Sequence, residues 1–210
     1  MEYAGDLETH LTVESVPADR IAVLRRFAEL QGLKCLHIVL DRGHSVSQPM
    51  LTRHGQGVLS SELEVARELA DRLREAGFDV TRIKIEAAPL NEDVPQSDGA
   101  AASLPANHYF EHHVKLVIEG DADLAGLTRL AERHQARLSR NALRVRDDGR
   151  LERFVTQRCW SVGRVTAEQR LNALRWDLNQ AGWTILETEA EFVVYDSNLD
   201  VDAGWLTVGG

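Results

Sequence analysis

The chain contains two copies of one pattern, and this internal duplication limits the possible folds more than any other feature. Four pairs of residues mark it, each separated by 103 to 105 residues: His10 and His113, Thr52 and Thr156, Gly77 and Gly182, and Glu86 and Glu191. The separation grows slowly along the chain, as it does when short insertions collect in loops. Repeats with matching order are units of structure, so the 210 residues are predicted to form two similarly folded halves.

The first half reads as strand, helix, strand, strand, helix, strand. Alternating polar and apolar residues predict strands over 8–14, 34–41, 48–54 and 79–87. Apolar residues at helical spacing predict helices over 17–31 and from Ser61 to about Ala76. Ser61 with Glu64 forms a candidate capping box for the second helix.

The second half repeats the order, with strands predicted over 110–119, 141–146, 152–158 and 184–195. Helices are predicted over 123–134 and from Thr166, which forms a candidate capping box with Gln169. This order predicts an α+β fold, an internal duplication of two βαββαβ ferredoxin-like lobes with antiparallel sheets. The lobes would span 1–88 and 108–210, joined by a linker over 89–107 in which no periodicity is visible.

The charge and hydropathy of the chain exclude some classes of partner. A formal net charge of −9 disfavours broad nucleic-acid binding, which usually requires a basic protein. A negative net charge is compatible with a local basic pocket that holds a small anionic ligand such as a nucleotide. No apolar run is long enough for a membrane span, and the acidic N-terminus does not resemble a secretory signal, so a cytoplasmic location is expected. The oligomeric state stays open.

Polar residues on the first strand of each half form the candidate site. Both helices of a βαββαβ unit cover one face of its sheet, so alternate side chains reach the other face. That face carries His10 and Thr12 in the first half and His113 and Lys115 in the second. Packing the two sheets toward each other about a pseudo-twofold axis would create a groove lined by these residues, with His10 and Glu86 near each other.

The two histidine motifs resemble those of the two-histidine phosphoesterases, the superfamily of RNA 2′,3′-cyclic phosphodiesterases and LigT-like proteins. Its members are bilobal, carry His-x-Thr/Ser in each lobe and need no metal. The resemblance implies a metal-independent phosphodiesterase without a cofactor, in which His10 and His113 act as base and acid while Thr12 and Lys115 hold the phosphate. Lys115 departs from the motif. Candidate substrate-binding residues are Arg53, His54, Lys84 and Arg158.

Two other functions stay open. The duplicated chain could be a non-catalytic tandem ferredoxin-like module that binds a small molecule or a protein partner. Alternatively, His10, Glu86, His113 and Glu191 could hold a divalent metal, since imidazole and carboxylate suit zinc, iron, nickel or manganese. The vicinal-oxygen-chelate enzymes use similar ligands on duplicated lobes, but their unit is βαβββ.

Overall fold

The structure, a computed structural model, describes residues 1–120 and 122–206. The first half comprises β1 (Gly5–Val13), α1 (Ala18–Leu30), β2 (Lys34–Leu40), β3 (Ser47–Gly57), α2 (Leu59–Glu75) and β4 (Val80–Ala87). After a short helix α3 (Asp98–Ala101), the second half comprises β5 (Tyr109–Ile118), α4 (Leu124–Arg133), β6 (Ala136–Asn141), β7 (Leu151–Trp160), α5 (Arg164–Gln180) and β8 (Thr184–Asp196). The fold is therefore α+β, with the predicted βαββαβ order present twice.

Seven of the eight predicted strands match the structure to within a few residues, but the prediction for β6 was wrong. The sequence predicts a strand over 141–146, whereas β6 ends at Asn141. The strand begins directly after Gln135, whose φ of 55° makes a tight turn from α4. Because this turn needs only one residue in the left-handed region, no glycine or proline marks it in the sequence.

The strands of both halves close into one antiparallel barrel in the order β1-β3-β2-β6-β7-β5-β8-β4. Within each half, the first strand lies between the third and the fourth. The halves meet at two seams, where β2 pairs with β6 and β4 pairs with β8. A closed barrel leaves no unpaired sheet edge, so the two open sheets expected from the sequence satisfy each other's backbone hydrogen bonds.

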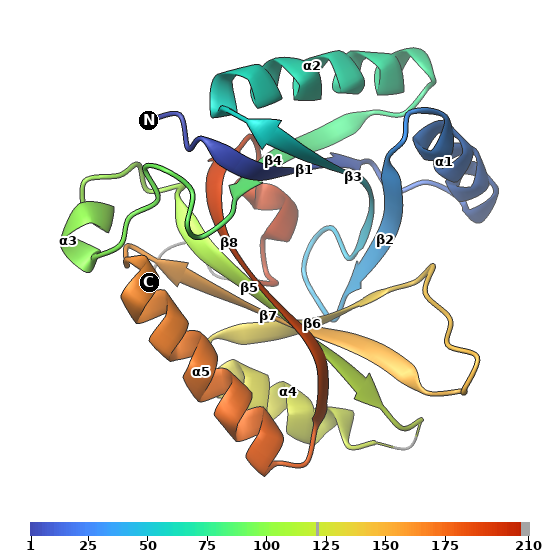
Figure 1. The fold of residues 1–210 in the computed structure, drawn as a ribbon. Helices are drawn as coiled ribbons and strands as arrows, with labels where there is room; N and C mark the ends of the chain where they lie inside the picture. The colour runs from blue at the N-terminus through green and yellow to red at the C-terminus, as the bar shows by residue number, and fades with distance from the viewer. Residues whose placement is uncertain (121, 207–210) are drawn as a thin grey trace.

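The helices cover the outside of the barrel. Figure 1 shows α1 and α2 on one side and α4 and α5 on the opposite side. Each pair buries its own apolar cluster against the outward side chains of the strands, with Leu24, Leu73 and Ile85 in the first half and Leu127, Leu174 and Val155 in the second. Most outward positions are apolar, and the alternate positions of the same strands, which are mostly polar, point inward.

The two predicted capping boxes were wrong, because both helices begin earlier than Ser61 and Thr166. The residues at their N-caps are Val58 and Gly163, and neither has a capping side chain. At α2, Glu2 accepts hydrogen bonds from the amides of Leu59, through its carbonyl (2.8 Å), and Ser60, through its carboxylate (3.1 Å). These distant acceptors satisfy helix amides that no local side chain reaches.

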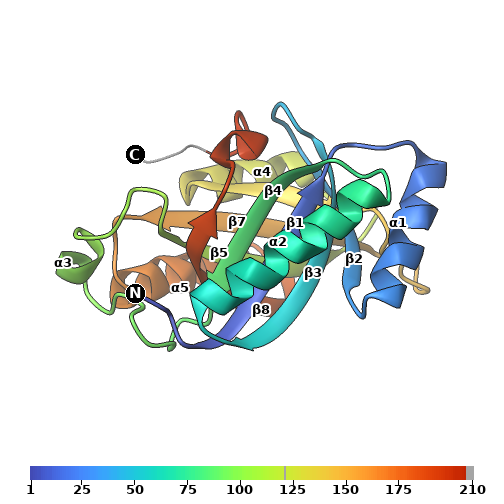
Figure 2. The same cartoon turned by 90° about the horizontal axis from the view of Figure 1, so that it is seen from above.

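The segment between the halves likewise supplies hydrogen-bond acceptors to the N-terminus of α5. Where the sequence predicts a linker without regular structure, the chain forms α3, which lies beside α5 in Figure 2. The carbonyl of Pro95 accepts from the Arg164 amide (2.8 Å), and the Asp98 carboxylate accepts from the Gly163 amide (2.8 Å) and the Thr166 hydroxyl (3.0 Å). This segment is therefore attached to the second half by defined hydrogen bonds.

The chain after β8 folds against the barrel. A 3-10 helix, η1 (Leu199–Asp202), places Asp202 in the barrel interior, and the indole of Trp205 donates to the carbonyl of Leu138 (3.1 Å). Trp205 and Leu206 pack with Leu40 and Ile38 of β2. Among the described residues, every helix is too short or too polar to cross a lipid bilayer.

Candidate functional site

The interior of the barrel contains a cavity of about 570 Å³. Alternate residues of β1 and β5 reach it, namely Glu8, His10 and Thr12 from β1 and Glu111, His113 and Lys115 from β5. The prediction that the polar faces of the two sheets enclose a shared space is therefore confirmed in its geometry. Both candidate histidines line this space.

The two histidines are held in matching ways. Nδ1 of His10 lies 2.9 Å from the Thr52 hydroxyl, and Nδ1 of His113 lies 3.0 Å from the Thr156 hydroxyl. Each threonine is the cross-strand partner of its histidine. The threonine pair that marked the repeat thus has a physical role, because it fixes the ring orientation in both halves.

Beyond this matching contact, the surroundings of the rings differ. Nε2 of His10 forms a 2.7 Å hydrogen bond with the buried carboxylate of Glu86. Nε2 of His113 lies 3.3 Å from Glu111 and 3.9 Å from Glu191. The expected proximity of His10 and Glu86 is confirmed.

A chain of buried ion pairs crosses the interior between the two halves. Nζ of Lys84 lies 2.6 Å from both Glu86 and Glu111. Glu111 also pairs with Arg158, whose guanidinium donates to Asp202 (2.5 Å), and Asp202 accepts from Arg82 (2.8 Å). Arg82 in turn pairs with Asp196 across the β4–β8 seam. Such buried charges are tolerated because each has a partner of opposite sign.

The ion pairs keep these groups ionised in spite of burial. Burial alone would raise the pKa of Glu111, but Arg158 and Lys84 hold it well below its usual range. Burial likewise opposes ionisation of Asp202, whose pKa is nevertheless lowered to about 2 by Arg158 and Arg82. The pKa of Lys84 is raised because Glu111 and Glu86 outweigh its own burial.

Glu191 is the exception in this network. Burial and the neighbouring carboxylates of Glu86, Glu8 and Glu189 raise its pKa well above the usual range, and Lys84 offsets them only in part. Glu191 sits directly across from Glu111 in the β5–β8 pairing, so two like charges face each other. The region around Glu191 therefore has an excess of negative charge.

Carboxylates and apolar side chains concentrate on different strands of the cavity wall. Glu8, Glu187, Glu189 and Glu191 provide carboxylates on β1 and β8. The apolar side chains come from β2, β3, β7 and the C-terminal segment: Leu36, Ile38, Leu40, Met50, Phe154 and Trp205. These elements also contribute polar groups such as Lys34, Gln48 and Glu152. A second, smaller cavity of about 360 Å³ shares Glu8, Glu189 and Glu191 with the first and also reaches Glu86. The acidic wall thus stands between the two spaces.

The predicted site residues fall into two groups. Besides the two histidines, the cavity is lined by Thr12, Lys115, Lys84 and Arg158. Lys84 and Arg158 form buried ion pairs with carboxylates. Nζ of Lys115 lies 3.7 Å from Glu152 and 3.6 Å from Glu187. The candidate basic residues are therefore already paired with carboxylates.

Arg53 and His54 lie away from the main cavity. The guanidinium of Arg53 pairs with Glu62 of α2, so this side chain belongs to the helix-covered face, and its prediction as a groove residue was wrong. The reason is the alternation of β3, in which Thr52 points inward and Arg53 outward. His54 is exposed beside Lys34 and Glu8 and borders only the smaller cavity.

Sequence reasoning missed two acidic members of the interior network, Asp196 and Asp202. They lie at and beyond the end of β8, where alternation no longer predicts direction. It also gave no role to Glu8, although the pattern Glu-x-His occurs at 8–10 and again at 111–113. The repetition of that pattern was the sequence signal that could have placed Glu8 in the site.

The fourth strands of the two halves carry opposite charges at two of three matching inward positions, and the third position is glutamate in both. Arg82, Lys84 and Glu86 point inward from β4, whereas β8 has Glu187, Glu189 and Glu191 at positions 105 residues later. The repeats are thus similar in fold and different in the chemistry of their inner faces.

Comparisons with known proteins give weak structural similarity only. No protein-family model and no curated protein sequence matches the chain. Among solved structures, the acetolactate synthase small subunit from Thermotoga maritima is 15% identical with a TM-score of 0.32, covering 92% of this chain and 96% of its own. A chlorite dismutase-like protein is 13% identical with a TM-score of 0.27, covering 91% and 96%. Similarity at this level assigns no function.

The resemblance to two-histidine phosphoesterases was wrong. Neither similar structure belongs to that superfamily, and no family model supports it. The site gives the physical reason. His10 is hydrogen-bonded to a buried carboxylate, and Glu191 and Glu111 lie beside His113. A phosphodiester between these rings would face several carboxylates, which repel its negative charge.

Proposed function

We propose that the chain is a binding module for a small molecule that occupies the barrel cavity. The supporting observation is the lining of this 570 Å³ space, in which apolar side chains and carboxylates concentrate on different strands. Its volume lies within the range of roughly 300–1,000 Å³ that is usual for small-molecule sites. The fitting ligand has an apolar body and an uncharged or cationic polar end.

The apolar wall would provide most of the binding free energy. Leu36, Ile38 and Met50 offer aliphatic surface, and Phe154 and Trp205 offer aromatic surface. Removing such surface from water contributes about 25 cal/mol per Å² of apolar area. The polar end would then fix the orientation, because the carboxylates of Glu187, Glu189 and Glu191 lie on a different strand from this apolar surface.

An anionic ligand, including a nucleotide, fits this lining poorly. The interior cations Arg82, Lys84 and Arg158 already have carboxylate partners within the network. An anion bound to any of these three cations would have to displace one of these carboxylates, leaving it buried without a counter-charge. Phosphate-bearing ligands are for this reason not part of the proposal.

Three probes with the same apolar body test the proposal: n-octanol, n-octylamine and octanoate. Trp205 lines the cavity, so occupancy should change its fluorescence, and binding to the folded state should raise the melting temperature. We expect octanol and octylammonium to bind and octanoate to bind at least about tenfold more weakly, a difference of about 1.4 kcal/mol.

A pair of matched substitutions locates the binding. Ile38→Trp fills the apolar part of the cavity, whereas Val23→Trp adds the same group to an exposed position on α1. Binding should be lost in the first variant and unchanged in the second. Equal binding in both variants, or no binding of any probe to the wild type, would exclude the cavity as a ligand site.

A further inference from the structure

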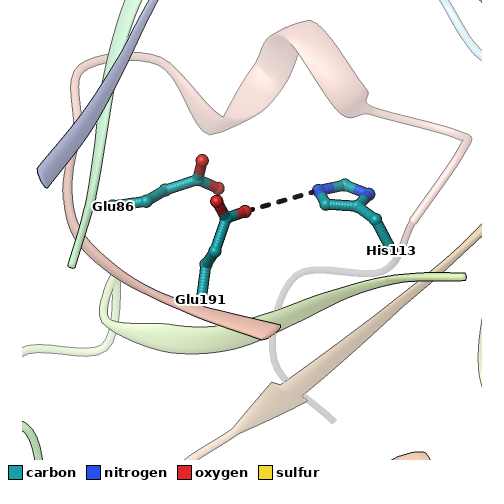
Figure 3. A group of neighbouring side chains, drawn as sticks. All are labelled: Glu86, His113 and Glu191. Carbon is teal, nitrogen blue, oxygen red and sulfur yellow. Dashed lines mark ion pairs between the residues drawn. The ribbon is translucent and has the colours of Figure 1, made fainter. Parts of the chain in front are cut away.

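The buried side chain of Glu86 and the half-buried side chains of His113 and Glu191 converge between the two cavities. One ligand atom from each lies within 4.8 Å of the others, and Figure 3 shows both carboxylates directed toward the imidazole. We propose that these three residues bind one divalent first-row transition-metal ion, with Zn²⁺, Mn²⁺ and Co²⁺ as the test ions. This inference is independent of the organic ligand proposed above.

The local charge favours a cation. Glu8 faces Glu86 across β1 and β4, and Glu111 faces Glu191 across β5 and β8, so each half brings a like-charge pair into the interior. Like charges in directly opposite positions destabilise a sheet unless a counter-charge lies near. Lys84 and Arg158 neutralise Glu111, but Glu191 has no ion-pair partner other than His113 among the described residues.

Glu86 has an acceptor that the protein does not fully use. Its Oε2 is hydrogen-bonded to His10, whereas Oε1 lies 2.6 Å from Nζ of Lys84 without the alignment of a hydrogen bond. Lys84 directs its hydrogen bond to Glu111 instead (2.6 Å). A carboxylate oxygen has two lone pairs, so Oε1 keeps an acceptor direction for a metal bond beside its ion pair with Lys84.

The surrounding hydrogen bonds orient the three ligands. Nδ1 of His113 is hydrogen-bonded to the Thr156 hydroxyl, and Nε2 is therefore directed toward Glu191 and Glu111. His10 fixes one oxygen of Glu86 and is itself held by Thr52. Partners of this kind set ring orientation and ligand basicity in protein metal sites. His10, predicted from the sequence as a direct ligand, therefore acts in this proposal by positioning Glu86.

The distances require a small closure around the ion. Nε2 of His113 lies 3.9 Å from Glu191, whereas bonds of about 2.1 Å in tetrahedral geometry separate ligand atoms by roughly 3.4 Å. Rotation of the glutamate side chains can provide this change without moving the strands. One imidazole with two carboxylates suits zinc, manganese or cobalt better than calcium or magnesium, which prefer oxygen alone.

The position of the cluster gives the ion both access and an open coordination position. Glu191 borders both cavities, Glu86 borders the smaller one and His113 borders the larger one. An ion could therefore arrive from the smaller cavity and present its remaining coordination position to the larger one. Three protein ligands and one open position are typical of metal sites that bind water or a further ligand.

The competing explanation is that the cluster is complete without an ion. In that case Lys84 compensates the charge of Glu86, and the histidines serve as hydrogen-bond and ion-pair partners of the carboxylates without an ion. The two explanations differ in one measurable respect, which is whether a divalent ion binds with a stoichiometry of one and depends on Glu191.

Calorimetric titration of the 210-residue protein, first dialysed against EDTA, provides the test. Zn²⁺, Mn²⁺ and Co²⁺ are added separately, and the absorption spectrum of the Co²⁺ complex reports its coordination. We expect one ion per chain for at least one of the three. Absence of one-to-one binding for all three would overturn the proposal.

Two glutamates on the same strand form a matched pair of variants. Glu191→Gln removes a ligand, whereas Glu187→Gln removes the same charge from the rim of the cavity. We expect the first to weaken binding by about 10- to 100-fold and the second by less than about threefold. Equal weakening would indicate general acidic attraction and would overturn the proposal.

His113→Gln provides a second ligand test should Glu191→Gln fail to fold. Loss of the imidazole should shift the Co²⁺ absorption bands or abolish binding. An unchanged spectrum at unchanged affinity would show that His113 is not a ligand and would also overturn the proposal.

Discussion

Glu191 is held in a conformation that costs the folded protein free energy. Burial and the carboxylates of Glu86, Glu8 and Glu189 raise its pKa, with Lys84 opposing them only in part. Because the folded state favours the protonated form, this group stabilises the fold below its unfolded pKa of about 4.3 and loses that contribution as pH rises. Neutral pH is therefore the condition in which Glu191 is least favourable.

Substitution of Glu191 by Gln should raise stability in metal-free buffer. We expect a gain on the order of 1 kcal/mol at pH 7 and a smaller one at pH 4, since protonated glutamate and glutamine are similar. Urea denaturation in EDTA at the two pH values measures the difference. A variant less stable than wild type at pH 7 would contradict the account of crowded carboxylates.

His112 should make stability sensitive to mild acid. It is buried on the helix-covered side of β5, where burial lowers its pKa in spite of the hydrogen bond to Gln157. A histidine with a lowered pKa stabilises the fold fully above its unfolded value of about 6.5, and that contribution is lost as pH falls through the lower folded value.

The His112→Gln variant tests this dependence. Its stability should decline less steeply than that of wild type below about pH 6.5, because one of the groups that must be protonated on unfolding is gone. Thermal denaturation between pH 7 and pH 5 gives the slope. His37 and His108 also have pKa values lowered by burial, so the decline should be reduced and not abolished.

At the scale of elements, the seam between β4 and β8 depends on buried charges. Arg82 of β4 pairs with Asp196 of β8 and with Asp202 of η1. Arg82→Met would leave both carboxylates without this partner, and removal of one member of a buried ion pair costs about 3–5 kcal/mol. Urea denaturation should show a loss of this size.

The matched control for the seam is a partly exposed arginine that also has two carboxylate partners. Arg146, in the loop before β7, pairs with Asp148 and with Glu152 of β7. Arg146→Met should change stability by much less than Arg82→Met, because water reaches Arg146 and Asp148 and screens their charges. Similar losses in both variants would show that burial of the seam does not determine its contribution.

The hydrogen bonds that begin α5 come from the segment before β5. Asp98→Ala removes the acceptor for the Gly163 amide and the Thr166 hydroxyl. We expect faster hydrogen exchange in the first turn of α5 and unchanged exchange in α4. Glu168→Ala, which removes only an exposed ion pair with Arg164, should leave exchange in the first turn unchanged.

The elements that sequence predicted well are those whose pattern is local. Alternation along β1 and β5 placed His10 and His113 on one face correctly, because side-chain direction depends only on position within a strand. The wrong predictions depend on distant partners. The acceptor for the first amides of α2 is Glu2, not the predicted Ser61. Asp202 reaches the barrel interior because a 3-10 helix follows the last strand.

Closure of the barrel belongs to the same class of non-local features. The β2–β6 and β4–β8 pairings join residues from different halves, and no sequence pattern specifies which exposed edges meet. The sequence indicated two sheets facing each other but not their fusion into one ring of strands. The candidate site was therefore predictable in its histidines and not in the ion pairs that surround them.

At the scale of the whole molecule, the two halves should unfold together. Each half alone would expose two unpaired strand edges and a face rich in charged side chains, both of which the barrel removes from water. Native-state hydrogen exchange in increasing urea should give one common opening free energy for slow amides in β1 and β5. Earlier opening of one half would show that it is stable without the other.

The different charges of the two inner faces have a consequence for the evolution of the two repeats. A barrel made from two first halves would bring two copies of Arg82 and Lys84 into one interior, and one made from two second halves would bring together two sets of Glu187, Glu189 and Glu191. Neither assembly would keep the pairing of Lys84 with Glu111, because the two residues come from different halves, so the present copies are no longer interchangeable. A mutation that reverses the charge at Lys84 must be answered by a change at Glu111 in the opposite copy, which ties the evolution of each repeat to that of its twin.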